Sequence, residues 1–223
     1  MRKLAILFIL LCSFVFANSA GNLNAGFLVL ERVYNSELMA PYDIFHHTQF
    51  HTKPWMNVFT VSPQGKTITT FEGLRVETDF GIRNAPRIDV LVIPSAEHNM
   101  DSDLQNTELR DWIRETSKSA QYVVTLCDGA FMLANTGLLD GRKATTFPSD
   151  VAQFRKMFPN VNTLEGYSFV HDGKFLTSQG GAKSYDVAMY LVDLIYGEKV
   201  AAGVGRGLVI PWKNPDLRYF AAK

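Results

Sequence analysis

The stretch YVVTLCDGAFMLANT, residues 122–136, decides the fold. Its first part, 122–126, is an apolar run rich in β-branched side chains, which predicts a buried strand. Its last part, 129–136, predicts a helix that Gly137 ends. Only Cys127 and Asp128 separate the two elements, so the strand must turn sharply into the helix, with Gly129 relieving crowding. The sequence therefore predicts a cysteine at a nucleophile elbow.

Apolar strands and helices alternate on both sides of this stretch. Strands are predicted at 25–30, 57–62 and 88–93, helices at 37–51, 102–118, 151–158 and 182–196, and hairpins at 67–78 and 167–177. Residues 201–223 show no clear period, and we expect them to pack across the surface. The alternation predicts an α/β fold with a mainly parallel sheet covered on both faces. Ligand sites of such sheets lie at the carboxyl ends of the strands, which points to the loops after Leu30, Ile93 and Leu126.

The composition is that of an ordinary globular protein. Of the 223 residues, 47% are hydrophobic and 20% are charged, and the formal net charge is zero. Lys and Arg form no stripe, and no helix-turn-helix segment follows, so we expect no nucleic-acid partner. No repeat, linker or change of composition follows residue 24, which predicts a single domain over residues 21–223.

The first twenty residues differ from the rest. A basic dipeptide precedes an apolar run at 4–16, and small and polar residues follow it. This order predicts a secretory signal peptide over residues 1–20, cleaved after Ala17 or Ala20, and a secreted or periplasmic mature protein. The alternative is an uncleaved membrane anchor, but the run is shorter than the about 20 residues that a span needs. After cleavage we expect no association with a membrane.

Signal cleavage also removes Cys12 and leaves Cys127 as the one cysteine of the mature chain, so no intramolecular disulfide forms. At the start of a helix, the Cys127 thiol lies beside unpaired N–H groups and the positive end of the helix dipole. We therefore expect its pKa to fall below the free value of about 8.5. The alternative is a small core cysteine with no chemical role.

Residues 127–147, CDGAFMLANTGLLDGRKATTF, resemble the core motif of the ThiJ/PfpI superfamily, which is class I glutamine amidotransferase-like and includes the parkinsonism-associated deglycases. More narrowly, they resemble isocyanide hydratases and the sensing domains of AraC-type regulators. The resemblance extends to ELMAPYDIF at 37–45, IDVLVIPS at 88–95 and GKFLTSQGGAKSYDVAMYLVDLIYG at 173–197. It implies a flavodoxin-like three-layer sandwich and a homodimer.

The resemblance also implies an acid beside the cysteine, supplied by the first strand–helix connection. Glu37, four residues before Pro41, stands in that place. A carboxyl desolvated beside a thiolate is expected to stay protonated, to hydrogen-bond the sulfur and to donate a proton. The alternative is that Glu37 only caps its helix, as an acid in a first turn does well.

Two departures from the family pattern affect the expected chemistry. Relatives carry a histidine directly after the cysteine or after Thr-Thr, where this chain has Asp128 and Phe147, so a Cys–His hydrolase mechanism lacks its base. The family's Gly-Gly pair after the third strand is replaced by Ser95 and Ala96. The backbone N–H groups of Ala96 and Asp128 remain as candidate donors of an oxyanion hole. Ser95 and Phe147 are candidate pocket residues.

Other residues are weaker candidates. His98 follows the third strand and either overhangs the pocket or lies in solvent. His47 and His51 have the i, i+4 spacing of metal ligands but no third ligand nearby, so we expect them at the surface or an interface and predict no metal. Gly180 and Gly181 are expected to serve close packing, because no Gly-rich phosphate loop surrounds them. No cofactor is predicted.

The sequence thus favours an isocyanide hydratase-like lyase or a cysteine-dependent hydrolase that acts on a small molecule. Cys127 would attack an electrophilic carbon of the substrate, and Glu37 would transfer the proton. The alternative is a non-catalytic ligand-binding or redox-sensing module in which Cys127 is oxidised to the sulfinate. Glyoxalase or deglycase chemistry is a third possibility, against which the missing histidine counts.

Overall fold

The computed structural model describes residues 21–211, 213 and 217–222, so the predicted signal peptide lies outside the described residues. One sheet has the strand order β12-β10-β11-β7-β6-β1-β2-β5. Neighbouring strands in it run parallel except β10 and β11. This confirms the predicted mainly parallel sheet. The strands are β1 (Leu23–Leu28), β2 (Met56–Ser62), β5 (Phe80–Gly81), β6 (Val90–Ile93), β7 (Tyr122–Leu126), β10 (Phe169–Asp172), β11 (Phe175–Ser178) and β12 (Tyr219–Ala221).

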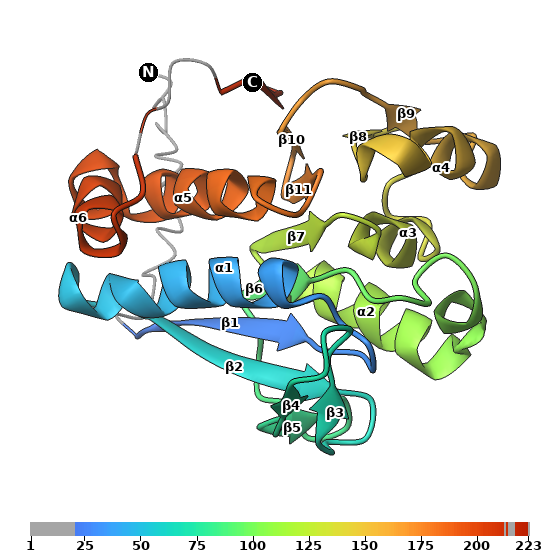
Figure 1. The fold of residues 1–223 in the computed structure, drawn as a ribbon, viewed down its shortest axis with the longest axis horizontal. Helices are drawn as coiled ribbons and strands as arrows, with labels where there is room; N and C mark the ends of the chain where they lie inside the picture. The colour runs from blue at the N-terminus through green and yellow to red at the C-terminus, as the bar shows by residue number, and fades with distance from the viewer. Residues whose placement is uncertain (1–20, 212, 214–216, 223) are drawn as a thin grey trace, which may run out of the picture.

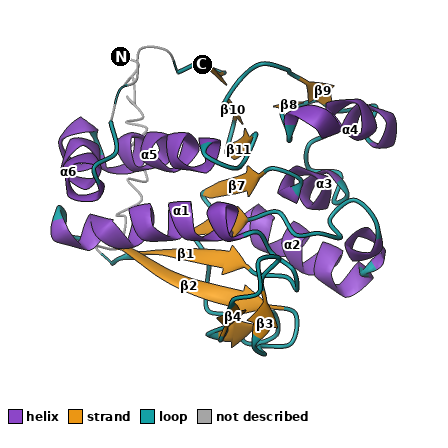
Figure 2. Ribbon diagram, viewed as in Figure 1, coloured by secondary structure: helices purple, strands orange, loops and turns teal. Residues whose placement is uncertain are grey.

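Helices cover both faces of the sheet and complete a flavodoxin-like α/β fold (Figures 1 and 2). One group packs together on one face: α1 (Asn35–His47), α5 (Lys183–Tyr196) and α6 (Glu198–Leu208). The other face carries α2 (Thr107–Ser119) and α3 (Gly129–Ala134), and α3 packs on β6 and β7. Peripheral elements are the hairpin β3 (Ile68–Thr69) and β4 (Arg75–Val76), the pair β8 (Lys143–Ala144) and β9 (Asn162–Thr163), and α4 (Val151–Met157).

The central strands are buried, as their continuous apolar sequences predict. All four residues of β6 are buried, and in β7 only Tyr122 is partly exposed. Side chains on both faces of a covered parallel strand leave water, which is why such strands show no polar alternation. The carboxyl ends of β1, β6 and β7 meet at one edge of the sheet, and the loops after them face one another there.

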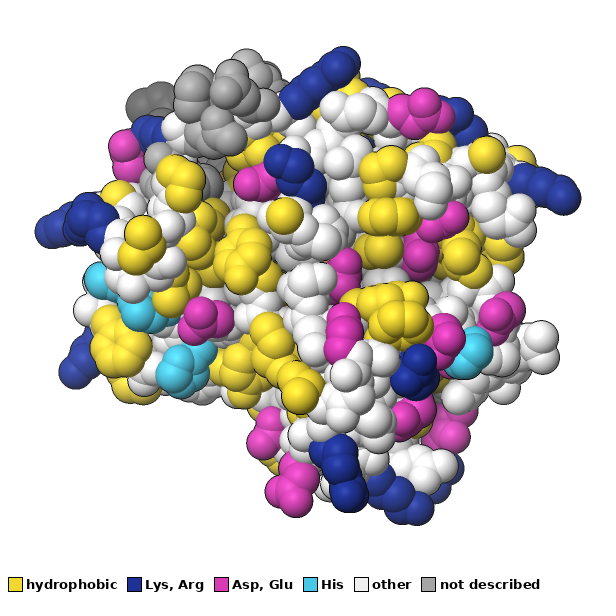
Figure 3. Space-filling view, viewed as in Figure 1, with side chains coloured by type: hydrophobic (Ala, Val, Ile, Leu, Met, Phe, Trp, Pro, Cys, Tyr) yellow, Lys and Arg dark blue, Asp and Glu magenta, His cyan; other side chains and the backbone are white. Residues whose placement is uncertain are grey.

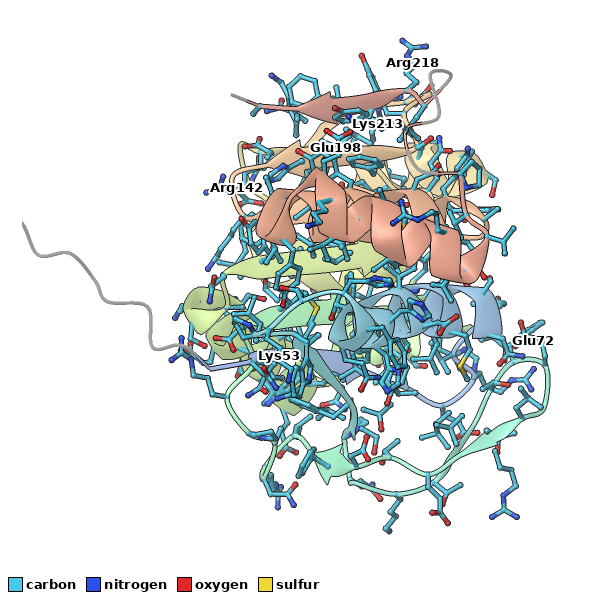
Figure 4. The ribbon with its side chains drawn as sticks, turned by 90° about the vertical axis from the view of Figure 1, so that its left-hand side faces the viewer. Lys53, Glu72, Arg142, Glu198, Lys213 and Arg218 are labelled. Atoms are coloured by element: carbon cyan, nitrogen blue, oxygen red, sulfur yellow. The ribbon has the colours of Figure 1, made fainter. Side chains whose placement is uncertain are left out.

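The structure differs from the predicted elements in two segments. The helix expected at 102–118 is a 3-10 turn, Ser102–Gln105, followed by α2, because the Asn106 side chain accepts the N–H of Leu109 at 3.0 Å and caps a new helix. Residues 201–223, in which the sequence shows no clear period, hold most of α6 and the strand β12. Beyond α6, Lys213 pairs with Glu198 at 2.7 Å across the start of that helix (Figure 4).

The surface is mixed in charge. On the face shown in Figure 3, Lys and Arg side chains lie scattered among Asp and Glu rather than gathered in one stripe.

Within residues 21–211, 213 and 217–222, no helix is both long enough and apolar enough to cross a membrane.

Candidate functional site

The turn between β7 and α3, residues 126–129, has the geometry of the predicted elbow. Cys127 adopts a left-handed backbone conformation with φ +52°, which is uncommon for a residue with a side chain. Its N–H donates to the Ser178 carbonyl at 3.0 Å, and its own carbonyl accepts the Thr146 hydroxyl at 3.1 Å. A Cβ at position 129 would overlap the backbone carbonyl of Ile93, so only glycine fits there. The backbone therefore fixes Cys127 at the carboxyl end of β7.

The connection from β11 to α5 closes over the cysteine. Gly180 has φ +79°, and a Cβ there would lie 2.8 Å from the Cys127 nitrogen and overlap the Cys127 Cβ. The next residue, Gly181, donates its N–H to Glu37 Oε1 at 2.7 Å. This confirms the close-packing role predicted for Gly180, whereas a Cβ at Gly181 would stand in open space and that residue contributes its N–H instead. Cys127 is only 7% exposed as a result, so bulky reagents have little access to it.

Glu37 reaches the site from the first turn of α1 and is buried. Besides the bond from Gly181, its Oε2 accepts the Ser36 hydroxyl at 3.1 Å. Glu37 therefore lies at the edge of the sheet that carries Cys127, where the sequence predicted it. The predicted hydrogen bond from Glu37 to the sulfur is absent within the described residues: Cys127 Sγ donates instead to Asp128 Oδ2, at 3.7 Å.

Asp128 follows the cysteine and is half-buried beside it. Its Oδ1 lies 3.2 Å from the Thr146 hydroxyl, and its Oδ2 faces the thiol. Burial and then the negative charge of Asp150 raise the pKa of Asp128 to about 6. The hydrogen bonds from Thr146 and Cys127 act in the opposite direction, and the charge of Glu37 adds a smaller rise. A carboxyl that titrates near neutral pH therefore lies in contact with the sulfur.

The pKa of the Cys127 thiol is raised, contrary to the expectation from the helix start. Burial is the largest cause, followed by the charges of Asp128 and Glu37. The Ser95 hydroxyl and the backbone N–H of Asp128 lower it, but by less. The helix N–H groups favour the thiolate, but the desolvation of the sulfur and the two carboxylates outweigh them. At neutral pH the resting group is a protonated thiol.

The predicted oxyanion donors differ in availability. The N–H of Asp128 faces the sulfur, as its effect on the thiol pKa shows. The N–H of Ala96 is already taken, because it donates to Asn99 Oδ1 at 2.9 Å. The role predicted for Ala96 therefore requires that this bond break first. Ser95 is fully buried, and its Oγ has no hydrogen-bond partner among the described residues, although its hydroxyl lowers the pKa of Cys127.

The remaining candidates are His98, Phe147 and the pair His47 and His51. The His98 side chain is 50% exposed and lies 3.4 Å from Asp101, as expected of a solvated loop histidine. Phe147 is exposed and follows Thr146 into the next turn. His47 and His51 lie over the glycine face of α6 rather than at a metal site, and the described residues contain no group of three or more His, Cys, Asp or Glu that could hold a metal ion.

Three contributors to the site were not predicted. Thr146 anchors both the elbow and Asp128, and Asn99 occupies the Ala96 amide. Tyr34 lies at the site from the β1–α1 loop, where burial and then the charge of Cys127 raise the pKa of its phenol. Each contact joins residues far apart in the chain except that of Asn99, three residues from Ala96, where an Asx-type turn gave a local signal.

The sequence is similar to those of several known proteins. The family model described as DJ-1/PfpI family matches residues 24–194. The chain is 26% identical over 180 residues to an isonitrile hydratase of Pseudomonas putida, covering 80% of this chain and 75% of that one. It is 24% identical over 148 residues to the HTH-type transcriptional regulator GbdR of Pseudomonas aeruginosa, covering 65% of this chain but only 39% of the regulator.

Solved structures show the same fold. Drosophila melanogaster DJ-1beta superposes with a TM-score of 0.74 at 17% identity, covering 86% of this chain and 100% of the other. An AraC family transcriptional regulator from Pseudomonas putida gives a TM-score of 0.74 at 20% identity, covering 83% and 99%. These identities support the fold alone. With the family model matching well over half of its length, the chain belongs to the DJ-1/PfpI family.

Proposed function

We propose that this protein is an exported, cysteine-dependent enzyme that adds water to a small electrophilic molecule, with an isonitrile as the first candidate. The observation that carries the proposal is Cys127 on the elbow, touched by the carboxyl of Asp128 and close to that of Glu37. No histidine faces this sulfur in the described part of the chain, so carboxyls must move the protons. The similarity to an isonitrile hydratase supports the substrate class. Export rests on the sequence of residues 1–20.

The reaction needs a nucleophile and a proton donor. Cys127 Sγ forms a bond to the electrophilic carbon as its thiol proton passes to a neighbouring carboxyl, and the Glu37 carboxyl, in its protonated form, donates a proton to the substrate. Water then attacks the same carbon with Glu37 taking back a proton, and the remaining hydroxyl proton passes to the substrate nitrogen. The carbon–sulfur bond breaks as the thiol proton returns to Cys127. The net change is the addition of one water to the substrate, and the enzyme is restored.

The redox-sensing alternative has less support from this geometry. Oxidation of a cysteine to sulfenate or sulfinate proceeds from the thiolate. Burial, Asp128 and Glu37 all raise the pKa of Cys127, which keeps the group in the less oxidisable thiol form. A directed attack on a bound electrophile, with a carboxyl removing the proton, suits a buried thiol better.

Turnover of a small alkyl isonitrile tests the proposal. We expect loss of the isonitrile and formation of the N-substituted formamide by the purified mature protein. Cys127→Ala should abolish turnover, and Glu37→Gln should lower kcat by about 10²-fold or more, the usual contribution of a general acid. His98→Ala is the matched control, because this histidine is half-exposed and lies in the loop after β6, and it should turn over like the parent. Turnover by Cys127→Ala equal to that of the parent, or none by the parent, would refute the proposal.

A further inference from the structure

Because the pKa of the Cys127 thiol is raised, the proposed nucleophile is protonated at rest and needs a base to remove its proton. Cys127 Sγ lies 3.7 Å from Asp128 Oδ2 and donates to it, and both groups lie in the same turn of backbone. Glu37 is less available, because Oε1 accepts the Gly181 N–H at 2.7 Å and Oε2 accepts the Ser36 hydroxyl at 3.1 Å. We propose that Asp128 is the catalytic base that removes the proton from Cys127 as the sulfur attacks. This rests on the proposed role of Cys127 as nucleophile.

Asp128 is held in place for this task. The Thr146 hydroxyl lies 3.2 Å from Asp128 Oδ1 and 3.1 Å from the Cys127 carbonyl, so one side chain ties the carboxylate to the turn that carries the sulfur. Thr146 itself is fully buried. With Oδ1 engaged in this way, Oδ2 is the oxygen left to face the thiol. The carboxylate is thus oriented by its neighbours before any substrate binds.

The charges around Asp128 set the pH at which it can work. Asp150 approaches it from the turn before α4, Glu37 from α1 and Tyr34 from the β1–α1 loop, and the Cys127 thiol lies in contact. Burial and Asp150 raise the pKa of Asp128 to about 6. A base is most effective when its pKa lies near the working pH, because it is then both ionised and sufficiently basic. Asp128 meets that condition.

The proton and electron balance closes with two carboxyls. The Sγ–H bond breaks, its proton passes to Asp128 Oδ2, and the sulfur lone pair forms the bond to carbon. Glu37 donates a separate proton to the substrate and later recovers one from the attacking water. When the carbon–sulfur bond breaks, Asp128 returns its proton to the sulfur. Each carboxyl therefore ends the cycle as it began.

The rate at which iodoacetamide alkylates Cys127, measured from pH 4.5 to 9, tests this step without any substrate. In this reaction the Sγ–C bond forms, iodide leaves and the thiol proton passes through Asp128 to solvent. We expect a rise in rate centred near pH 6, where Asp128 ionises. Asp128→Asn should remove this rise and slow alkylation at pH 7 at least about tenfold.

Whether Asp128→Asn slows or accelerates the alkylation of Cys127 tells a base from a residue that acts only through its charge. If Asp128 acted only through its charge, Asp128→Asn would remove a cause of the raised Cys127 pKa and would accelerate alkylation at pH 7. Acceleration, or no rise near pH 6 in the parent protein, would overturn the proposal. The effect is also independent of the isonitrile assay: a parent that alkylates as expected but hydrates no isonitrile refutes the proposed function and leaves Asp128 as the base.

A second variant keeps the test valid if Asp128→Asn fails to fold. Asp150→Asn removes the charge that helps to raise the pKa of Asp128 without touching the sulfur. The rise in alkylation rate should then move to lower pH while its plateau stays the same. A midpoint that does not move would show that Asp128 is not the group that titrates, and would overturn the proposal.

Discussion

Replacing Gly180 by Ala should be among the most damaging single-methyl changes in this protein. A Cβ at this position would lie 2.8 Å from the Cys127 nitrogen and 3.0 Å from its Cα, and would overlap its Cβ. The atoms in the way are mostly backbone of the elbow, which cannot move without displacing Cys127. The backbone at Gly180 also has φ +79°, where a side chain is strained in any case. Crowding and strain therefore act together at one residue.

Gly181 provides the matched control, because it separates the two effects. Its φ is +52°, yet nothing lies within 4 Å of a Cβ built there. The free energy of unfolding of Gly181→Ala should therefore fall only by the cost of a side chain in the left-handed backbone conformation, about 1–2 kcal/mol. The free energy of unfolding of Gly180→Ala should fall by that amount and by about 1–3 kcal/mol more from overpacking, or about 2–5 kcal/mol in all.

Urea denaturation followed by circular dichroism gives the free energy of unfolding of both variants and the parent. We expect Gly180→Ala to be less stable than Gly181→Ala by at least about 1 kcal/mol. The native alkylation rate of Cys127 should also change in Gly180→Ala, because the elbow must shift to admit the methyl group. Equal free energies for the two variants would show that Gly180 does not pack tightly against Cys127 and does not close the site over it.

Three further predictions concern other parts of the molecule. Burial, then the charges of His47 and Arg206, lower the pKa of His51, so the folded state disfavours its protonation. The stability that His51 contributes is present above pH about 6.5 and lost as the pH falls toward the folded pKa, and His51→Gln should flatten the fall in the free energy of unfolding between pH 7 and 5. Light scattering at micromolar concentration should give the mass of a homodimer, and a monomer mass would contradict this. N-terminal sequencing of the native protein should begin at Asn18 or Gly21, whereas an intact first residue would exclude cleavage.

The sequence predicted the elbow because its signal is local. Only two residues separate an apolar strand from a helix, and this spacing leaves one geometry for Cys127. Glu37 was placed by the resemblance to the family, and parallel strand order then brought it to the same edge as the cysteine. Its hydrogen bond to Gly181 joins residues 144 positions apart, and no local pattern carries that information.

Helix α6 was missed for a different reason. Three glycines, at 203, 205 and 207, lower its intrinsic helix propensity, each by about 1 kcal/mol relative to alanine. Tertiary packing outweighs that cost, since the rings of His51 and His47 fill the space where side chains at Gly203 and Gly207 would stand. The two histidines therefore have the spacing of a metal pair in the sequence but pack against α6 in the fold.

The sign of the Cys127 pKa shift could not be read from the motif. A helix start favours the thiolate, but the shift also depends on how much water reaches the sulfur and on which charges face it. Burial comes from Gly180, and one of the charges comes from Glu37, both distant in the chain. Asp128 was visible in the sequence, but only as a backbone donor and as the residue standing where relatives carry histidine. Its contact with Sγ gave it a role.

Because Cys127 is shielded from solvent, the rate at which it is labelled reports local opening of the structure. It is the one free cysteine of the described residues and is 7% exposed, so a bulky maleimide dye can reach it only when the elbow or the connection over it opens. The labelling rate then depends on how often the site opens, and its dependence on denaturant concentration distinguishes local opening from global unfolding. Because the mature chain would carry no second thiol, the signal needs no engineered label and reports from a single place, the centre of the site itself.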